Sequence, residues 1–77
     1  MELTFGEKIK LLRDEMELKQ TELGREVNMT QRKTSYLEHG KYEPSMGDIK
    51  ALCRFFDVSA DYLFGFPKAL PYPKRKA

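Results

Sequence analysis

The fold can be worked out from residues 20–40, QTELGREVNMTQRKTSYLEHG. They predict two short helices joined by a tight turn at Asn28-Met29. Asparagine is the usual non-glycine residue for the left-handed backbone that such a turn needs. Thr30 is a good N-cap for the second helix, and Gly40 is a common residue just past a helix C-terminus. The sequence therefore defines both ends of a helix over about 30–39.

The second helix of this pair begins with Gln31, Arg32 and Lys33, whose side chains are hydrogen-bonding or cationic. Such side chains at a helix N-terminus suit a DNA groove, where base edges and phosphates must both be reached. Leu37 is expected to face the core, and Thr34, three residues earlier, shares that face. The remaining faces are open to a partner, and double-stranded DNA is the partner that their chemistry indicates.

The first helix of the pair opens at Gln20. Lys19, just before it, has no side-chain acceptor and is a poor N-cap. Leu23 and Val27 are expected to face inward. Gly24 costs roughly 1 kcal/mol relative to alanine in a helix interior, so we expect it to allow the close approach of a neighbouring helix.

The sequence on either side predicts three more helices. Thr4 and Glu7 match a capping box, in which each side chain accepts a hydrogen bond from the backbone N–H of the other residue. The helix that follows, over about 5–17, carries an apolar stripe at helical spacing, Phe5, Ile9, Leu12 and Met16, with Leu11 beside it. Ser45 and Ser59 open a fourth helix and a short fifth helix, over about 60–64, which Gly65 ends. The inward residues of these two helices are expected to be Ile49, Leu52, Cys53, Phe56 and Leu63.

A chain of 77 residues is enough for one small domain and too short for two. Its single cysteine, Cys53, cannot form an internal disulfide, so we expect a cytoplasmic location and a filler role in the core. No apolar run approaches the roughly 20 residues needed to cross a bilayer. The acidic start MELTFGEK lacks the apolar region of a secretory signal.

The net charge of +2 is unevenly distributed. Residues 19–42 contain five basic and three acidic side chains, and residues 67–77 contain four basic side chains and no acidic one. By contrast, acidic side chains are in excess in residues 1–18 and in residues 43–66. This polarity favours a molecule with one face for a polyanion.

Five short helices in this arrangement resemble the phage repressor/Cro-like family, also called the XRE family. The resemblance covers about residues 5–65 and is carried by Ile9-Lys10-Leu11-Leu12-Arg13, Gln20-Thr21-Glu22-Leu23, Leu37-Glu38-His39-Gly40-Lys41, Pro44-Ser45 and Val58-Ser59-Ala60-Asp61-Tyr62-Leu63. It implies an all-α, five-helix, lambda-repressor-like DNA-binding domain at residues 1–65, with the helix-turn-helix formed by the second and third helices. Residues 66–77 would be a basic, proline-containing, mobile tail.

The resemblance also implies roles for individual residues. Base edges or neighbouring phosphates would be contacted by Thr30, Gln31, Arg32 and Tyr36. The DNA backbone would be contacted by Gln20, Lys33 and Lys41. Glu38 matches a glutamate that is more often structural. The departures from the family pattern are Lys19, Gly24, Asn28 and Thr34, and the threonine at this core position should bond back to a backbone carbonyl one turn earlier.

Several of these roles have alternatives. Arg32 could bond to guanine O6 and N7, or contact a phosphate or solvent, and Gln31 carries an amide suited to adenine. Tyr36 could stack on a sugar or a thymine methyl, or simply cover Leu37. For His39, at a helix C-terminus, a helix-dipole interaction is expected first, a backbone phosphate contact second, and no metal site.

Tyr62, Phe64 and Phe66 gather near the end of the predicted domain, where only small elements can cover them. Exposed aromatic side chains invite a symmetric partner, so we expect these residues in a homodimer interface. The alternative is that they fold back onto Phe55 and Phe56.

The sequence therefore predicts a sequence-specific, double-stranded-DNA-binding transcriptional regulator, acting as a repressor and as a homodimer on a palindromic operator. A controller of a restriction–modification operon is a variant of this class. The alternative from another class is an antitoxin or other protein-interaction module that uses the aromatic end. No catalytic set surrounds the single histidine, and no metal cluster or phosphate-binding glycine loop is present in the sequence, so we expect no enzyme and no cofactor.

Overall fold

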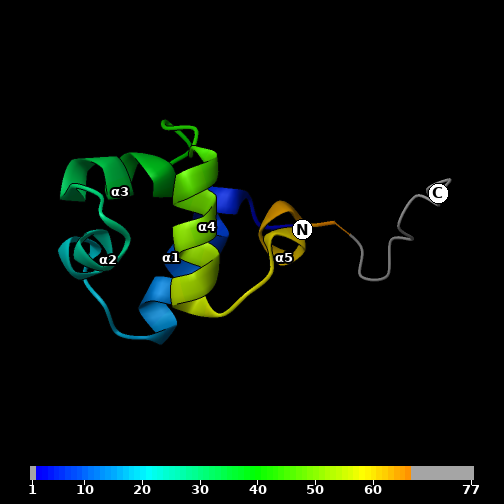
Figure 1. The fold of residues 1–77 in the computed structure, drawn as a ribbon, viewed down its shortest axis with the longest axis horizontal. Coiled ribbons are helices and arrows are strands. Elements are labelled where there is room, and N and C mark those ends of the chain that lie inside the picture. Colours follow the sequence, from blue (N-terminus) through cyan, green and yellow to red (C-terminus); the bar gives the residue numbers. More distant parts are fainter. Residues whose placement is uncertain (1, 67–77) are drawn as a thin grey trace, which may run out of the picture.

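The computed structural model describes residues 2–66, and within that range it contains five α-helices and no strand (Figure 1). The helices are α1 (Phe5–Glu15), α2 (Gln20–Val27), α3 (Gln31–Glu38), α4 (Met46–Phe56) and α5 (Ala60–Phe64). The predicted all-α, five-helix fold is thus confirmed. None of these helices is both long and apolar enough to span a bilayer. The predicted tail lies outside the described residues, apart from Phe66.

Most helix starts are fixed by local hydrogen bonds. Four helices begin after a residue whose hydroxyl accepts a hydrogen bond from the backbone N–H three residues later, as predicted: Thr4, Thr30, Ser45 and Ser59. Before α2, Lys19 provides no such side chain, but the Glu22 carboxylate accepts a hydrogen bond from the Lys19 N–H at 2.7 Å. Because a capping side chain is worth about 1 kcal/mol, these starts are stabilised without help from the rest of the fold.

Residues with a left-handed backbone conformation follow the helices. Asn28 and Gly40 have φ angles of 59° and 76°, as their residue types predicted. The end of α1 was predicted wrongly: the helix stops at Glu15 rather than near residue 17. Glu17 adopts φ 56°, and the Leu18 N–H donates to the carbonyl of Arg13 at 3.1 Å, which closes the helix early. Glutamate is not a residue type that announces a left-handed turn.

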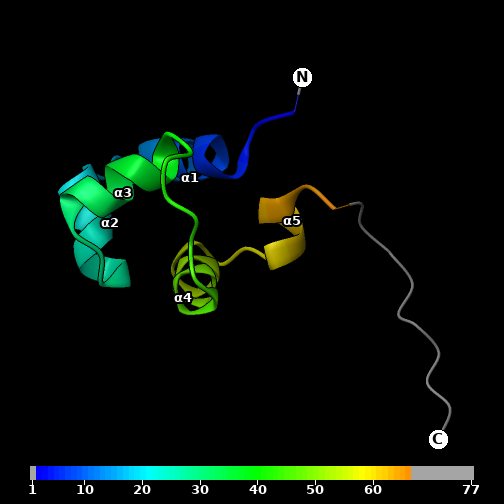
Figure 2. The same ribbon diagram turned by 90° about the horizontal axis from the view of Figure 1, so that it is seen from above.

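Within residues 2–66, seven apolar side chains form the buried core: Ile9, Leu23, Val27, Met29, Leu37, Leu52 and Leu63. Six of them were predicted to face inward, and Met29, in the turn between α2 and α3, was not. Figure 2 shows α4 end-on at one side of the bundle, between α2 and α5, which are the helices that it packs against. Because α4 is enclosed along one narrow stripe, only its Leu52 is fully buried.

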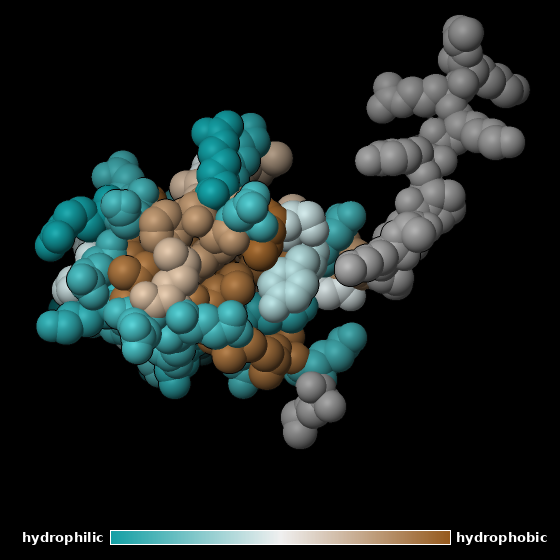
Figure 3. All heavy atoms as spheres, turned by 90° about the horizontal axis from the view of Figure 1, so that it is seen from below, coloured by the Kyte–Doolittle hydropathy of each residue, from teal (hydrophilic) through white to brown (hydrophobic). Residues whose placement is uncertain are grey.

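Several predicted core residues are therefore less buried than expected. The partly buried ones include Phe5, Leu12, Ile49, Cys53 and Phe56. Leu11 and Met16 are 42% and 49% exposed. Figure 3 views the molecule from the side opposite α3 and shows apolar side chains gathered in the middle of that face. The face away from α3 is thus more apolar than the stripe pattern alone predicted.

Two glycines allow close backbone approaches. A Cβ atom on Gly24 would lie 2.5 Å from the Met29 carbonyl oxygen and 3.1 Å from the Thr34 hydroxyl oxygen. The expected close approach is confirmed, and it involves the turn as well as α3. A Cβ atom on Gly6 would overlap the carbonyl oxygens of Leu37 and Glu38, so α1 crosses the end of α3 backbone to backbone. No role for Gly6 is predicted in the sequence analysis.

Candidate nucleic-acid interface

The side chains predicted to contact bases lie together on the exposed surface of α3. Thr30, Gln31, Arg32 and Tyr36 are all exposed, and Tyr36 retains 44% of its accessible surface. The opposite face of α3 is closed by Leu37 and by Thr34, whose hydroxyl donates to the Thr30 carbonyl at 2.9 Å, as predicted. α3 therefore has one buried face and one polar face, and it lies along one edge of the molecule (Figure 1).

A chain of side-chain hydrogen bonds joins the starts of α2 and α3. The Gln31 amide nitrogen donates to the Gln20 amide oxygen at 2.8 Å. The Gln20 amide nitrogen in turn donates to a carboxylate oxygen of Glu38 at 3.1 Å. These two bonds fix the orientation of both glutamines relative to the helices. Gln20 and Gln31 were each predicted as DNA contacts, but their pairing was not predicted.

This series of hydrogen bonds ends at a buried ion pair between α1 and α3. Arg13 Nε and Nη2 donate to the two carboxylate oxygens of Glu38 at 2.6 and 3.0 Å. Arg13 Nη1 donates to the Leu18 carbonyl at 2.7 Å. The two residues are only 8% and 6% exposed. Hydrogen bonding to Glu38 raises the pKa of Arg13 above its ordinary value, against the opposing effect of burial.

The structural role expected for Glu38 is consistent with this geometry, whereas Arg13 was missed as a functional residue. A signal for Arg13 was present in the sequence. It stands four residues after Ile9, on the inward stripe of α1, where a charge needs a buried partner. The partner lies 25 residues further along the chain, so residue spacing alone does not reveal it.

Lys33, predicted as a phosphate contact, lies in a cluster with Tyr42, from the segment between α3 and α4, and Asp48, from the first turn of α4. Its Nζ atom is 3.8 Å from Asp48 Oδ2 and 4.7 Å from the centre of the Tyr42 ring. The Tyr42 hydroxyl and the Ser45 backbone N–H donate to the same Asp48 oxygen, at 2.5 and 3.0 Å. We call Lys33, Tyr42 and Asp48 the Asp48 cluster.

The cluster shifts the protonation of both charged members. Burial acts to raise the pKa of Asp48, but the hydrogen bonds from Tyr42 and Ser45, together with the Lys33 charge, outweigh it and hold the pKa below the ordinary 3.8. Interaction with Tyr42 raises the pKa of Lys33, with burial opposing this shift and the Asp48 charge adding to it. Both groups are therefore charged at neutral pH.

The remaining predicted backbone contacts lie at the C-terminal end of α3. Lys41 is exposed, and its N–H donates to the Tyr36 carbonyl at 2.7 Å, which closes the helix around Gly40. His39 Nδ1 lies 2.8 Å from the Ser35 carbonyl oxygen, which can only accept a hydrogen bond, so Nδ1 is the donor in this contact. This local bond agrees with the expected interaction of His39 with the helix terminus.

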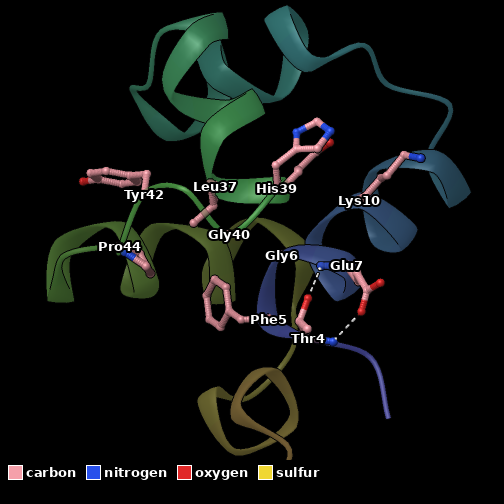
Figure 4. A pocket seen from close by; sticks show the side chains of 11 residues that line it. Thr4, Phe5, Gly6, Glu7, Lys10, Leu37, His39, Gly40, Tyr42 and Pro44 are labelled. Carbon is pink, nitrogen blue, oxygen red and sulfur yellow. Dashed lines mark hydrogen bonds between the residues drawn. The ribbon is translucent and has the colours of Figure 1, made fainter. Parts of the chain in front are cut away.

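An open depression of about 530 Å³ lies between the start of α1 and the end of α3. Figure 4 shows the Thr4–Glu7 capping box on one side of it and the Tyr42–Pro44 segment on the other. Its lining mixes apolar side chains with charged ones at the rim. Within residues 2–66, no three His, Cys, Asp or Glu side chains come together to hold a metal ion.

Comparison with known proteins identifies the family. A family model described as a helix-turn-helix domain matches residues 4–63, from the cap of α1 into α5. The chain belongs to this helix-turn-helix family. A comparison with curated protein sequences gave no match.

Solved structures similar to this helix-turn-helix domain include two of the P22 c2 repressor. The crystal structure of that repressor in complex with synthetic operator 9T has 28% sequence identity and a TM-score of 0.77, and the match covers 82% of this chain and 96% of that one. The solution structure of its DNA-binding domain has 30% identity and a TM-score of 0.74, and covers 82% and 84%. A transcriptional regulator from Listeria innocua, at 23% identity and a TM-score of 0.78 over 95% and 68%, shares the fold. The predicted resemblance to repressor-type helix-turn-helix domains is confirmed.

Proposed function

We propose that this helix-turn-helix domain is a sequence-specific, double-stranded-DNA-binding transcriptional regulator that acts as a repressor. The observation that carries the proposal is the polar surface of α3. At the start of this helix Gln31 is held by Gln20, which is in turn held by Glu38. Side chains fixed at the N-terminus of a recognition helix are in the position from which base edges are read in the major groove. The similarity to the operator-bound P22 c2 repressor supports the same reading.

The residues proposed to contact DNA divide into two sets. Base contacts are assigned to Gln31 and Arg32, with Thr30 and Tyr36 beside them. Arg32 presents a planar fork that can donate two hydrogen bonds to guanine, whereas the held amide of Gln31 suits adenine. Backbone contacts are assigned to Gln20, Lys41 and His39, which flank this surface at either end of the helix pair. Phosphate contacts of this kind fix the register of a protein on DNA without reading sequence.

Arg32→Ala tests the assignment to bases. We expect a loss of about 1–3 kcal/mol in binding to a duplex selected from a random pool, and a much smaller loss on unselected duplexes. Arg54→Ala is the matched control, because Arg54 is an exposed arginine in the last turn of α4. An equal loss on selected and unselected duplexes would remove Arg32 from the base contacts. If the wild-type domain has no sequence preference, the proposed function is wrong, and a protein-interaction role through the aromatic end becomes the better explanation.

The proposal includes a homodimer on a palindromic operator. Tyr62, Phe64 and Phe66 are 43%, 48% and 53% exposed, as expected for an interface. Phe64 lies 5.5 Å from Phe5 and 5.9 Å from Phe66 between ring centres, and the ring contact with Phe66 supports an aromatic patch formed by residues at this end of the domain. Two subunits would place their recognition helices roughly 34 Å apart along DNA. Sedimentation that finds only monomer on a palindromic duplex would contradict this part.

A further inference from the structure

The Asp48 cluster places an acidic side chain beside the surface proposed to meet DNA. Lys33 comes from the first turn of α3, Asp48 from the first turn of α4, and Tyr42 from the segment between them. Figure 1 shows the end of α3 and the start of α4 on the same side of the molecule, joined by this segment. A negative charge at such a position opposes DNA binding unless it has another task.

The geometry shows what the carboxylate does there. A single oxygen of Asp48 accepts hydrogen bonds from Tyr42 and Ser45 and faces the Lys33 ammonium, which also lies over the Tyr42 ring. The Asp48 side chain is only 13% exposed, and that of Lys33 is 36% exposed. If Lys33 turned outward to a phosphate, it would leave a largely buried carboxylate without its cation and would give up the aromatic contact as well.

From this arrangement we propose that Asp48 holds Lys33 away from phosphates and so lowers the affinity and the salt dependence of DNA binding, on the operator and on random DNA alike. In this inference Lys33 does not contribute to the phosphate contacts, although it lies on α3. The Asp48–Tyr42 hydrogen bond fixes the segment that carries Lys41, which keeps its own phosphate contact. The inference rests on the proposed function and changes the role predicted for Lys33.

The physical basis is that each phosphate contact contributes a fixed amount to salt dependence. A plot of log K against log salt concentration steepens by about 0.9 for each phosphate neutralised on double-stranded DNA. Non-specific binding depends almost wholly on these contacts, whereas specific binding also uses base edges. Withholding one lysine therefore weakens binding to random DNA and to the operator by about the same factor, and it flattens the salt dependence of both.

The test combines two substitutions. Asp48→Asn removes the charge but keeps an oxygen that can accept the hydrogen bonds from Tyr42 and Ser45. We expect it to steepen the salt slope by about 0.9 on a random duplex and on the selected duplex, and to raise affinity for both by a similar factor. Lys33→Met, which keeps the length of the side chain, should leave the slope of the wild-type domain unchanged. In the Asp48→Asn background it should return the slope to the wild-type value.

Asp57→Asn is the matched control. Asp57 is an exposed carboxylate just past the other end of α4, and asparagine tolerates its φ of 56°. The control changes the net charge by the same amount without touching Lys33, so its slope should equal that of the wild type. Thermal unfolding of every variant verifies that it is folded under the binding conditions.

Two results would overturn the inference. One is a flatter slope for Lys33→Met in the wild-type background, because Lys33 would then contact a phosphate despite Asp48. The other is an unchanged slope for a folded Asp48→Asn variant, which would leave Asp48 with a structural role only. A result that contradicts the proposed function can be told apart from these two, since the wild-type domain would then show no preference for any selected duplex.

Discussion

The exposed side chains at the starts of α2 and α3 are tied to the interior, whereas those at the aromatic end rest on one another. Gln31 is connected through Gln20 to Glu38, which pairs with Arg13 at 2.6 Å. At the other end, Phe64 makes ring contacts at 5.5 and 5.9 Å. Hydrogen bonds fix both distance and direction, but ring contacts tolerate sliding. A surface of the first kind suits the reading of base edges, and one of the second kind suits an adaptable apolar partner.

The largest effect is expected from removing Glu38, the buried carboxylate at which the series of hydrogen bonds ends. Glu38→Ala leaves Arg13 charged and buried without its partner, so we expect a loss of about 3–5 kcal/mol in the free energy of unfolding, measured with urea. Replacing both residues with apolar ones of similar volume, Arg13→Met with Glu38→Leu, should recover most of that loss. A loss below about 1 kcal/mol for Glu38→Ala would show that the pair does not hold the two helices together.

A smaller change interrupts the series of side-chain hydrogen bonds at Gln20. Gln20→Ala leaves the Arg13–Glu38 pair intact but removes the acceptor for the Gln31 amide, so affinity for the selected duplex should fall by about 1–2 kcal/mol. Part of this loss reflects the phosphate contact assigned to Gln20 and should also appear with random duplexes. Isothermal titration on both kinds of duplex separates the two parts. A loss of identical size on both would mean that Gln20 does not orient Gln31.

The aromatic end should respond differently. Phe64→Ala removes one ring contact with Phe5 and an exposed apolar surface, so we expect a loss of about 1 kcal/mol in the unfolding free energy of the monomer. Its effect on dimer dissociation, followed by sedimentation across a range of concentrations, should be larger than its effect on stability. The reverse order would indicate that Phe64 serves the core of the monomer and not an interface.

The smallest expected effect is a pH dependence from Asp48. Because its folded pKa lies below 3.8, the ionised carboxylate contributes stability that is present above about pH 4 and is lost as the pH falls through the folded pKa. Asp48→Asn should therefore be destabilised relative to the wild type at neutral pH, and the difference should shrink toward about pH 2. Urea unfolding at several pH values measures it. A difference that stays constant with pH would mean that the carboxylate charge contributes nothing to stability.

Features that depend on neighbouring residues could be predicted from the sequence. The left-handed turn at Asn28 and the bond from Thr34 back to the Thr30 carbonyl both follow from residue type and a separation of four or fewer. The early end of α1 could not be predicted, because Glu17 has no residue-type signal for φ 56°. Nor could the burial of Met29, which depends on how α2 and α3 pack against the rest of the chain.

In the candidate site too, some features can be predicted from neighbouring residues and others depend on how the helices pack. The exposed positions of Gln31 and Arg32 follow from helical periodicity once Leu37 is assigned to the core. The pairing of Gln31 with Gln20 and the cluster of Lys33 with Asp48 do not, because these bonds join different helices. Assigning Lys33 to a phosphate was reasonable from its place on α3, but the sequence did not show the carboxylate beside it.

Residue types and their spacing were enough to predict five helices, their caps and the polar surface of α3, since capping and periodicity act within one or two turns of chain. Which polar side chains can meet a partner, and which are already hydrogen-bonded to other helices, became clear only from the packed helices. Arg13 and Glu38 are 25 residues apart in the chain, and their charges could be buried only because folding brings them within 2.6 Å. Coulomb energy and hydrogen bonding depend on distance in space, and that distance exists only after the helices have packed.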